Sequence, residues 1–253
     1  MNELCEKKAM VTGGSSGIGR AIAIAYAQEG ADVVFSYYKH QKEANELVSF
    51  IKSLGRKVKA IHVDMNNFNH LNQFVEEGVN YLSGIDIFVN NAGMLTRHAG
   101  FLNIPLDAFD LIQTVNVRAP FFLTQRIAQC MQRGAKGGSI INISSMSAFI
   151  ISAGLTHYEC SKAALNMLTK AAAHALAKDN IRVNAIAPGL VATNMNRHQR
   201  EYESEIWDKR EARIPLQRVG KPEDIAYVAV MLASPRSAWI TGNVIPVDGG
   251  LGL

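Results

Sequence analysis

The stretch Val11-Thr12-Gly13-Gly14-Ser15-Ser16-Gly17-Ile18-Gly19 decides the fold of this chain. It follows the apolar run Ala9 to Thr12 and precedes a segment whose apolar residues recur at helical spacing. This order predicts a strand, a tight turn and a helix. Glycines in such a turn let the backbone bend sharply and let an anionic group approach the amides at the positive end of the helix. The stretch therefore predicts a phosphate-binding turn.

The context of the turn favours a dinucleotide as the ligand. Three residues separate Gly13 from Gly17, which differs from the G-x-G-x-x-G pattern, and the turn lacks the lysine of a Walker loop. The strand, turn and helix around it are nevertheless those that bind a pyrophosphate. The predicted contacts in the turn are Gly13, Ser15, Ser16, Gly17, Ile18 and Gly19.

Short runs rich in Val, Ile and Phe alternate with amphipathic segments along the whole chain. The runs are Ala9 to Thr12, Val33 to Ser36, Val58 to Val63, Ile85 to Val89, Ile140 to Ile143, Ile181 to Ile186 and Val244 to Val247. Strands of continuous apolar residues are buried on both faces, which is typical of a parallel sheet between two helical layers. We therefore predict an α/β fold with one Rossmann-type, doubly wound parallel sheet of about seven strands, flanked by helices on both faces.

Size and composition are consistent with a single globular domain. The chain has 253 residues, of which 48% are apolar, and no interior linker or repeat divides it, so residues 1–253 are predicted to form one domain. The net charge of +4 comes without long basic blocks, which argues against nucleic acid as a partner. No stretch reaches the roughly 18 apolar residues of a membrane span, and the chain enters its first strand almost at once. We expect neither secretion nor membrane insertion.

The three cysteines, Cys5, Cys130 and Cys160, bear on metal binding and location. They are too far apart for metal-ligand spacing and too few for a disulfide framework. We therefore expect no metal site and a reducing, cytoplasmic setting.

The end of the second apolar run bears on the choice of dinucleotide. In this kind of fold an acidic residue there binds the adenosine 2′-hydroxyl and selects NAD. Tyr37 occupies that place, while Asp32 lies at the other end of the run. Because no carboxylate would repel a 2′-phosphate, we predict NADP, with NAD as the alternative. The predicted cofactor residues here are Tyr37, Tyr38 and Lys39, and the candidate contacts to the phosphate are Ser36, Lys39 and His40.

Asp64 follows the third apolar run. Two roles are open for its side chain. It is expected to hydrogen-bond the adenine, to cap the helix that follows, or to do both.

Tyr158 and Lys162 lie four positions apart, and Ser145 lies thirteen positions before Tyr158. A phenol and an ammonium at this spacing share one face of a helix. A tyrosine normally holds its proton to about pH 10, and a nearby positive charge lowers a pKa by about one to three units. We therefore expect Lys162 to make Tyr158 an acid or base near neutral pH, with Ser145 holding a substrate oxygen. A surface pair without function is the alternative if the spacing is taken alone.

Taken together, these motifs resemble the short-chain dehydrogenase/reductase family over essentially the whole chain. The motifs are the glycine turn, Asn90-Asn91-Ala92-Gly93 after the fourth run, Ser145, the Tyr158/Lys162 pair, and Pro188-Gly189 followed by Thr193. The resemblance implies hydride transfer between a nicotinamide cofactor and a secondary alcohol or ketone, with Tyr158 as the catalytic acid and base.

The resemblance also implies roles for the remaining residues. Ser145 would position the substrate; Ser144 is the alternative, which the thirteen-residue spacing to Tyr158 disfavours. Lys162 would bind the nicotinamide ribose and lower the pKa of Tyr158, and Asn116 would hold a water linking Lys162 to solvent. The catalytic set is therefore Asn116, Ser145, Tyr158 and Lys162, and the further cofactor contacts are Asn91, Ala92, Gly93, Tyr158, Lys162, Pro188, Gly189, Val191 and Thr193.

The resemblance leaves the substrate open. Ser36-Tyr37-Tyr38, His157-Tyr158 and the tail Val247-Asp248-Gly249-Gly250 are similar to the glucose 1-dehydrogenase branch, which implies oxidation of a sugar or polyol. The alternative is a 3-oxoacyl-(acyl-carrier-protein) reductase, although Ser16 stands where those enzymes usually carry an arginine. A non-catalytic dinucleotide-binding regulator is a minor alternative, disfavoured by the presence of Tyr158 and Lys162.

Two further expectations concern the lid and the assembly. The charge-rich segment 194–215 follows a strand end, so we expect a lid over the site, with Tyr202, Ile206 and Trp207 on one helical face; a solvated surface helix is the alternative. Small side chains along a helix from Tyr158 to Ala177, together with the resemblance, imply a homotetramer that also uses a helix around Phe121 to Met131. Packing of that face within one chain is the alternative.

Overall fold

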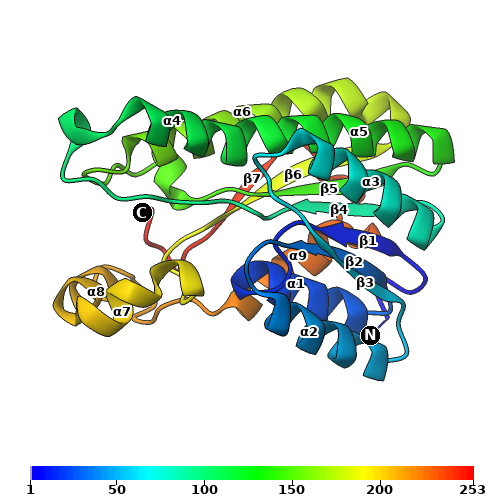
Figure 1. Cartoon of the computed structure of the whole chain (residues 1–253), viewed down its shortest axis with the longest axis horizontal. Coiled ribbons are helices and arrows are strands. Elements are labelled where there is room, and N and C mark those ends of the chain that lie inside the picture. Colours follow the sequence, from blue (N-terminus) through cyan, green and yellow to red (C-terminus); the bar gives the residue numbers. More distant parts are fainter. Residues whose placement is uncertain (1) are drawn as a thin grey trace.

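The computed structural model describes residues 2–253, and a single parallel sheet forms its centre (Figure 1). Among these residues the strands are β1 (Lys8–Val11), β2 (Asp32–Tyr37), β3 (Val58–His62), β4 (Ile87–Asn90), β5 (Gly138–Ile143), β6 (Ile181–Pro188) and β7 (Val244–Val247). They pair in parallel in the order β3-β2-β1-β4-β5-β6-β7. The predicted Rossmann-type α/β fold is confirmed, and every predicted strand is present.

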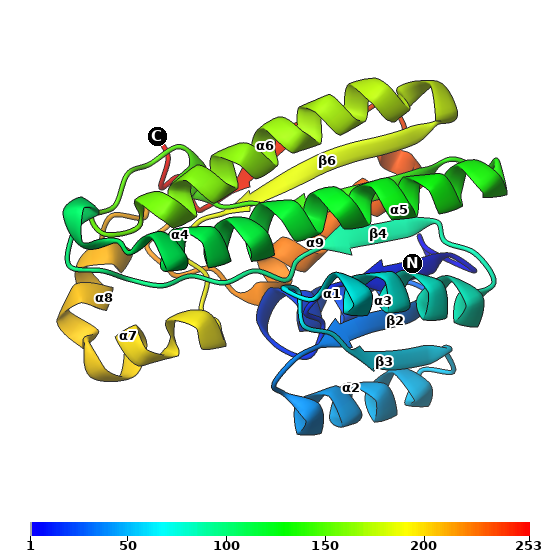
Figure 2. The same ribbon diagram turned by 45° about the horizontal axis from the view of Figure 1, so that its top comes forward.

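Helices cover both faces of the sheet (Figures 1 and 2). They are α1 (Gly17–Gln28), α2 (Gln41–Ser53), α3 (Phe68–Leu82), α4 (Leu106–Gln113), α5 (Ala119–Gly134), α6 (Thr156–Leu176), α7 (Arg197–Tyr202), α8 (Ser204–Glu211) and α9 (Pro222–Ala233). Helices α1, α2 and α9 pack on one face, and α3, α5 and α6 pack on the other. Among residues 2–253, no helix combines the length and apolar character that crossing a bilayer requires.

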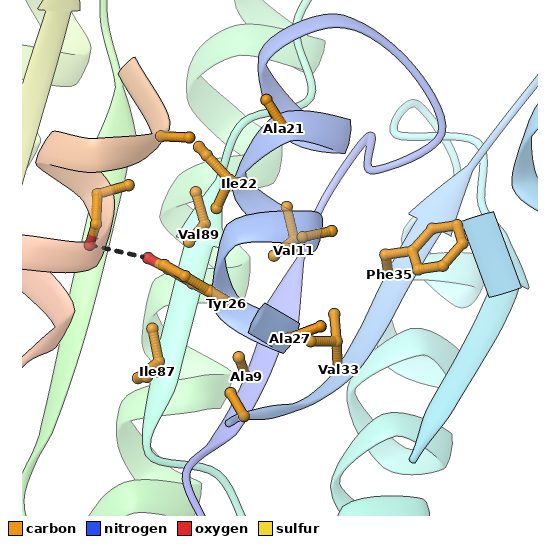
Figure 3. Close-up of a cluster of buried hydrophobic side chains, with 14 of the residues drawn as sticks. Ala9, Val11, Ala21, Ile22, Tyr26, Ala27, Val33, Phe35, Ile87 and Val89 are labelled. Carbon is orange, nitrogen blue, oxygen red and sulfur yellow. Dashed lines mark hydrogen bonds between the residues drawn. The ribbon is translucent and has the colours of Figure 1, made fainter. Parts of the chain in front are cut away.

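The first core cluster joins α1 to the sheet and to α9 (Figure 3). Ile22 and Tyr26 recur at helical spacing and are fully buried against Val11 and Val89 of the central strands. The Tyr26 hydroxyl donates to the carbonyl of Ala229 at 3.2 Å, a bond that contributes about 1 kcal/mol. Burial of an apolar side chain of this size contributes about 1.5–3 kcal/mol. This packing fixes the start of α1, and with it the glycine turn, against β1 and β4.

The register of the strands brings the expected motifs to one edge of the sheet. Val11 is paired with Val89, Asn90 with Asn142, and Ile143 with Ile186. The glycine turn, the loop after β4, the Ser145 region and the Pro188-Gly189 turn therefore leave the sheet side by side. Carboxyl ends of parallel strands, at the point where the strand order reverses, are where such folds bind ligands.

The segment 194–215 differs from the single helix face expected for it. Two short helices, α7 and α8, meet at Glu203, and both lie beyond the carboxyl edge of the sheet (Figure 2). Trp207 is buried with Leu190 and Ile214, while Tyr202 is 75% exposed. The predicted common face of Tyr202, Ile206 and Trp207 is therefore wrong, because the break at Glu203 turns α8 relative to α7.

Candidate active site

The glycine turn after β1 has the conformation that its sequence requires. Gly13 and Gly17 have φ angles of 66° and 53°, in the left-handed region where a Cβ atom is costly. A Cβ atom on Gly17 would lie 3.4 Å from the Thr193 side chain. The structure therefore brings Thr193, from the loop after β6, beside the turn after β1.

Ser36 and Thr12 hold this turn to its neighbours. The amides of Gly13 and Gly14 donate to the hydroxyl and carbonyl oxygens of Ser36, at 3.0 and 2.8 Å. The Thr12 hydroxyl accepts from the amides of Asn91 and Ala92, both at 2.9 Å. The sequence analysis missed Thr12 as a site residue; its signal was a hydroxyl residue directly before the glycines. The Ser36 hydroxyl is buried and accepts from Gly13; its expected contact with a 2′-phosphate stays a prediction.

The side chain of Asn91 closes the other side of the turn. Its Nδ2 atom donates to the carbonyl oxygens of Thr12 and Gly13, at 2.8 and 3.1 Å. This places Asn91, Ala92 and Gly93 along the edge of the turn, as expected for residues that border a common ligand.

The start of α1 fits the phosphates of a dinucleotide. Ser16 is the N-cap, but its side chain makes no capping hydrogen bond, and the first turn carries no acidic residue. The first amides of a helix have no partner within it, and the helix dipole favours an anion there. The chain's own groups therefore leave donors at Ser16, Gly17 and Ile18 facing the turn, and the residues present fit the pyrophosphate.

The residues after β2 have distinct environments. The Tyr37 side chain is buried and its hydroxyl donates to Gln41 Oε1 at 2.6 Å. Tyr38 and Lys39 are exposed, with Lys39 Nζ 5.8 Å from the centre of the Tyr38 ring. Asp32 lies at the far end of β2, where it pairs with Arg56 at 2.8 Å. Among residues 2–253, Lys39 forms no ion pair at the end of β2, and Tyr37 rather than a carboxylate ends that strand.

Asp64 does not cap helix α3, so that expected role is wrong. The helix α3 is capped by Asn67, whose Oδ1 accepts from the amides of Asn69 and His70 at 3.0 and 3.4 Å. Asp64 instead accepts from the amide of Asn66 at 2.9 Å. Three further residues separate Asp64 from the first helical residue, Phe68, so its carboxylate stabilises the turn before the cap.

Tyr158, Lys162 and Asn116 lie together beneath the loop after β4. Lys162 is buried on α6, and its Nζ atom donates to the carbonyl of Ile143 at 2.8 Å. A Cβ atom on Gly93 would lie 3.2 Å from Asn116 Oδ1 and 3.6 Å from Lys162 Nζ. The structure therefore unites residues from the β4 loop, from the segment before α5 and from α6.

Asn116 occupies a π-helical turn, Thr114–Arg118, between α4 and α5. Such turns are rare and occur often at functional sites. Asn116 Oδ1 accepts from the amide of Met94, and Nδ2 donates to the carbonyl of Met94, both at 2.9 Å. Nδ2 also donates to Ser161 Oγ at 3.1 Å. The side chain of Asn116 therefore ties the loop after β4 to the helix that carries Tyr158.

Ser145, and not Ser144, faces the cavity beside Tyr158. The hydroxyl of Ser144 is buried and donates to Asn166 Oδ1 at 2.6 Å. Ser145 Oγ accepts from the amide of Ser147 at 3.1 Å and lines a cavity at the carboxyl edge. Other walls of this cavity are Met146, Ile150, Gly189, Leu190, Arg210 and Arg213. The arginines were not singled out from the sequence, beyond their place in a charge-rich segment.

The titration of Tyr158 differs from the expectation. Burial raises the pKa of Tyr158, while the hydrogen bond with Ser145 and the charge of Arg97 lower it. Lys162 Nζ lies over the Tyr158 ring, 5.7 Å from its centre, and donates to the carbonyl of Ile143, so the raising by burial opposes the lowering expected from Lys162. Burial also lowers the pKa of Lys162 from 10.5 to about 8.

This burial predicts a pH-dependent stability. The unfolded chain keeps the Lys162 proton up to pH 10.5, whereas the folded chain releases it at about 8. Between these values the unfolded state binds more protons, so the free energy of unfolding rises with pH. At about 1.4 kcal/mol per pKa unit, the rise attributable to Lys162 is about 3 kcal/mol. Urea unfolding at both ends of this pH window should show that increment in the native protein and not in Lys162→Met. Equal pH dependence of the two proteins would contradict the assignment.

Comparisons with known proteins find relatives that match nearly the whole chain. The family model described as enoyl-(acyl carrier protein) reductase matches residues 13–252. An L-rhamnose 1-dehydrogenase (NAD(P)(+)) from a Sphingomonas species is 39% identical over 245 residues, which cover 97% of this chain and 96% of that protein. A 3-oxoacyl-(acyl-carrier-protein) reductase from Thermotoga maritima is 38% identical over 245 residues, covering 97% of both chains. The crystal structure of a short chain dehydrogenase from Burkholderia cenocepacia in complex with NADP has a TM-score of 0.92 at 33% identity, covering 99% of this chain and 100% of that one.

Proposed function

The chain belongs to the short-chain dehydrogenase/reductase family, and from this premise we propose that it is an NAD(P)-dependent oxidoreductase of secondary alcohols and the corresponding ketones. The observation that carries the proposal is the convergence of Ser145, Tyr158 and Lys162 beside the glycine turn. The Tyr158 hydroxyl belongs to a buried phenol and is hydrogen-bonded to Ser145, which lines the cavity. It suits proton transfer at an alcohol oxygen.

The chain's residues divide the chemistry between them. When bound, the nicotinamide supplies the ring carbon that accepts or donates a hydride. In oxidation, the phenolate form of Tyr158 takes the proton of the substrate hydroxyl, and in reduction the Tyr158 hydroxyl donates its proton to the substrate oxygen. Ser145 Oγ, in the cavity wall, holds the substrate oxygen against Tyr158. The positive charge of Lys162 would hold the ribose hydroxyls. The Asn116 side chain accepts from the amide of Met94 and so fixes the β4 loop close to Lys162.

The cofactor residues proposed here are those of the turn and of the loops around it. The start of α1 takes the pyrophosphate, and the loops after β4 and β6 border the nicotinamide half, as the closeness of Gly17 to Thr193 supports. We propose a preference for NADP over NAD, because Lys39 is an exposed cation at the end of β2. The NAD(P)-dependent relative and the NADP complex are consistent with either cofactor.

For the substrate we propose a sugar or polyol, in line with the L-rhamnose 1-dehydrogenase relative. The second candidate is a 3-oxoacyl thioester on a carrier protein, which the Thermotoga maritima relative favours. Ser16 in the glycine turn still weighs against this second candidate, since the resemblance would lead one to expect an arginine there.

A direct assay tests the proposed activity. Purified protein is mixed with each nicotinamide cofactor and a panel of aldoses, polyols, steroids and a 3-oxoacyl thioester, and nicotinamide absorbance is followed. We expect turnover with a sugar-like alcohol and a lower KM for NADP than for NAD. Activity confined to the thioester would replace the first candidate by the second. Cofactor binding without any turnover would instead favour a dinucleotide-binding regulator.

We propose a homotetramer built on the outer face of α6. Ala163, Met167 and Ala171 are exposed along this face, and Phe121 of the neighbouring α5 is 48% exposed. Small side chains allow close helix approach, and Met and Phe are common at interfaces. Light scattering should therefore give the mass of four chains of 27.6 kDa each. A single-chain mass would contradict the assembly.

The segment 194–215 is proposed as the lid, because Arg210 and Arg213 reach from it into the wall of the cavity. A cytoplasmic location is proposed from the free thiols of Cys5 and Cys160, which are exposed and suit a reducing compartment.

A further inference from the structure

Two guanidinium groups meet at one neutral oxygen beside the cavity. Gln199 Oε1 accepts from Arg97 Nη2 at 3.3 Å and from Arg210 Nη1 at 2.7 Å. Gln199 is only 8% exposed. Arg97 belongs to the loop after β4, whereas Gln199 and Arg210 lie on α7 and α8. The amide therefore gathers two cations from distant parts of the chain without neutralising either of them.

No carboxylate compensates this charge in the part of the chain that the structure describes. The ion pairs among residues 2–253 include neither Arg97, nor Arg210, nor Arg213. The nearest acid in the network, Glu203, accepts from Gln199 Nε2 at 3.2 Å and pairs with His198 at 3.4 Å. Asp248, below the cavity, accepts from the amides of the C-terminal turn.

The electrostatics agree with this geometry. Arg210 is half-buried, and burial together with the charges of Arg97 and Arg213 lowers the pKa of Arg210. Arg97 and Arg213 are exposed, so the cost falls on Arg210: a half-buried charge beside like charges and without a counter-ion is unfavourable unless a ligand of opposite sign pairs with it. The cluster therefore destabilises the free site and favours an anion.

The cluster also lies at the reacting group. Arg210 and Arg213 line the same cavity as Ser145, and the charge of Arg97 reaches the Tyr158 hydroxyl, whose pKa it lowers. An anion bound by these arginines would thus stand next to the alcohol or ketone carbon.

We propose that the substrate of this site carries a carboxylate, which Arg97, Arg210 and Arg213 bind next to the carbon that is oxidised or reduced. The substrate class is a hydroxy acid or oxo acid of sugar-like size, and this inference rests on the proposed oxidoreductase function. Planar guanidinium groups bind carboxylates through paired charge-assisted hydrogen bonds, which a neutral sugar cannot form. Anion binding would draw Arg210 from Gln199 and hold the lid segment over the cavity.

Pairs of substrates that differ in the carboxylate charge test whether the site prefers an acid over a neutral analogue. The probes are D-gluconate against D-glucitol, and 3-hydroxybutyrate against its methyl ester, each with both nicotinamide cofactors. We expect kcat/KM to favour the acid of a pair by at least about tenfold, the size of one charge-assisted hydrogen bond. Calorimetric binding of the same four compounds to the cofactor-loaded Tyr158→Phe protein gives a second measure that needs no turnover.

Matched variants test the arginines. Arg210→Gln and Arg97→Gln should each weaken binding of the acid by about tenfold or more and change the neutral partner by less than about twofold. The control is Arg197→Gln, which removes a lid arginine that is paired with Glu201 at 2.6 Å and is 66% exposed. It should leave the acid preference unchanged.

The outcomes separate this inference from the proposed function. Turnover of neutral alcohols as good as that of the acids would overturn the carboxylate site and leave the oxidoreductase intact. Activity restricted to a 3-oxoacyl thioester would overturn it too, because the acyl group of a thioester has no free carboxylate. Carboxylate binding that depends on Arg210, without any turnover of the bound acid, would support the anion site and count against the oxidoreductase. Absence of carboxylate binding to the cofactor-loaded protein would overturn the inference.

Discussion

Replacing Tyr158 by phenylalanine should remove nearly all turnover and leave dinucleotide binding unchanged. The variant keeps the buried ring, which is 7% exposed, and removes only the oxygen that we propose exchanges a proton with the substrate. Positioned proton transfer contributes about a hundredfold to ten-thousandfold to a rate. We expect kcat to fall within that range and the dissociation constant of the cofactor to change by less than about twofold, as measured by steady-state kinetics and fluorescence titration.

The control is Tyr227→Phe, a tyrosine on α9 that is 71% exposed and outside the cavity. Its turnover should equal that of the native protein. If Tyr158→Phe retained native turnover, the assignment of the proton-transfer group would be wrong.

Replacing Gly19 by alanine should lower both the stability of the protein and its affinity for the dinucleotide. A Cβ atom at this position would collide with the carbonyl oxygen of Gly13 and with Asn91 Nδ2. Both belong to the hydrogen-bonded edge of the glycine turn, so the turn must shift. Overpacking of this kind costs about 1–3 kcal/mol. We expect the free energy of unfolding to fall by that amount in urea and the affinity for the dinucleotide to fall by about tenfold or more.

A matched glycine provides the comparison. Gly134, at the end of α5, has no atom within 4 Å of the position of an added Cβ atom. Gly134→Ala should therefore bind the dinucleotide as the native protein does. Native affinity and stability in Gly19→Ala would show that the turn accommodates the added Cβ atom without the predicted shift.

The sheet and the turn were predictable because their signals are local. Continuous apolar runs predict buried parallel strands, and glycines between a strand and a helix predict the turn at Gly13 and Gly17. The grouping of Ser145, Tyr158 and Lys162 is different, because it came from the resemblance to a known family; their spacing alone also fits a surface pair. Tyr158 and Lys162, four positions apart, lie on the same side of α6, because α6 is a regular helix throughout.

The remaining features depend on tertiary contacts that no local pattern encodes. Arg97 and Gln199 are 102 positions apart, and their contact requires the β4 loop and the lid to meet. The burial of Lys162 turns its amine toward Ile143, which spacing alone does not indicate. The break at Glu203 and the cap at Asn67 depend on backbone angles that the charge-rich and polar runs leave open.

Direct hydride transfer is the central claim, and isotope transfer tests it most directly. The alcohol that the protein oxidises fastest is labelled with deuterium at the oxidised carbon, and the reduced nicotinamide is then isolated and weighed by mass spectrometry. We predict that the reduced cofactor carries the deuterium, with none exchanged into water. Deuterium in the solvent and none in the nicotinamide would contradict the account.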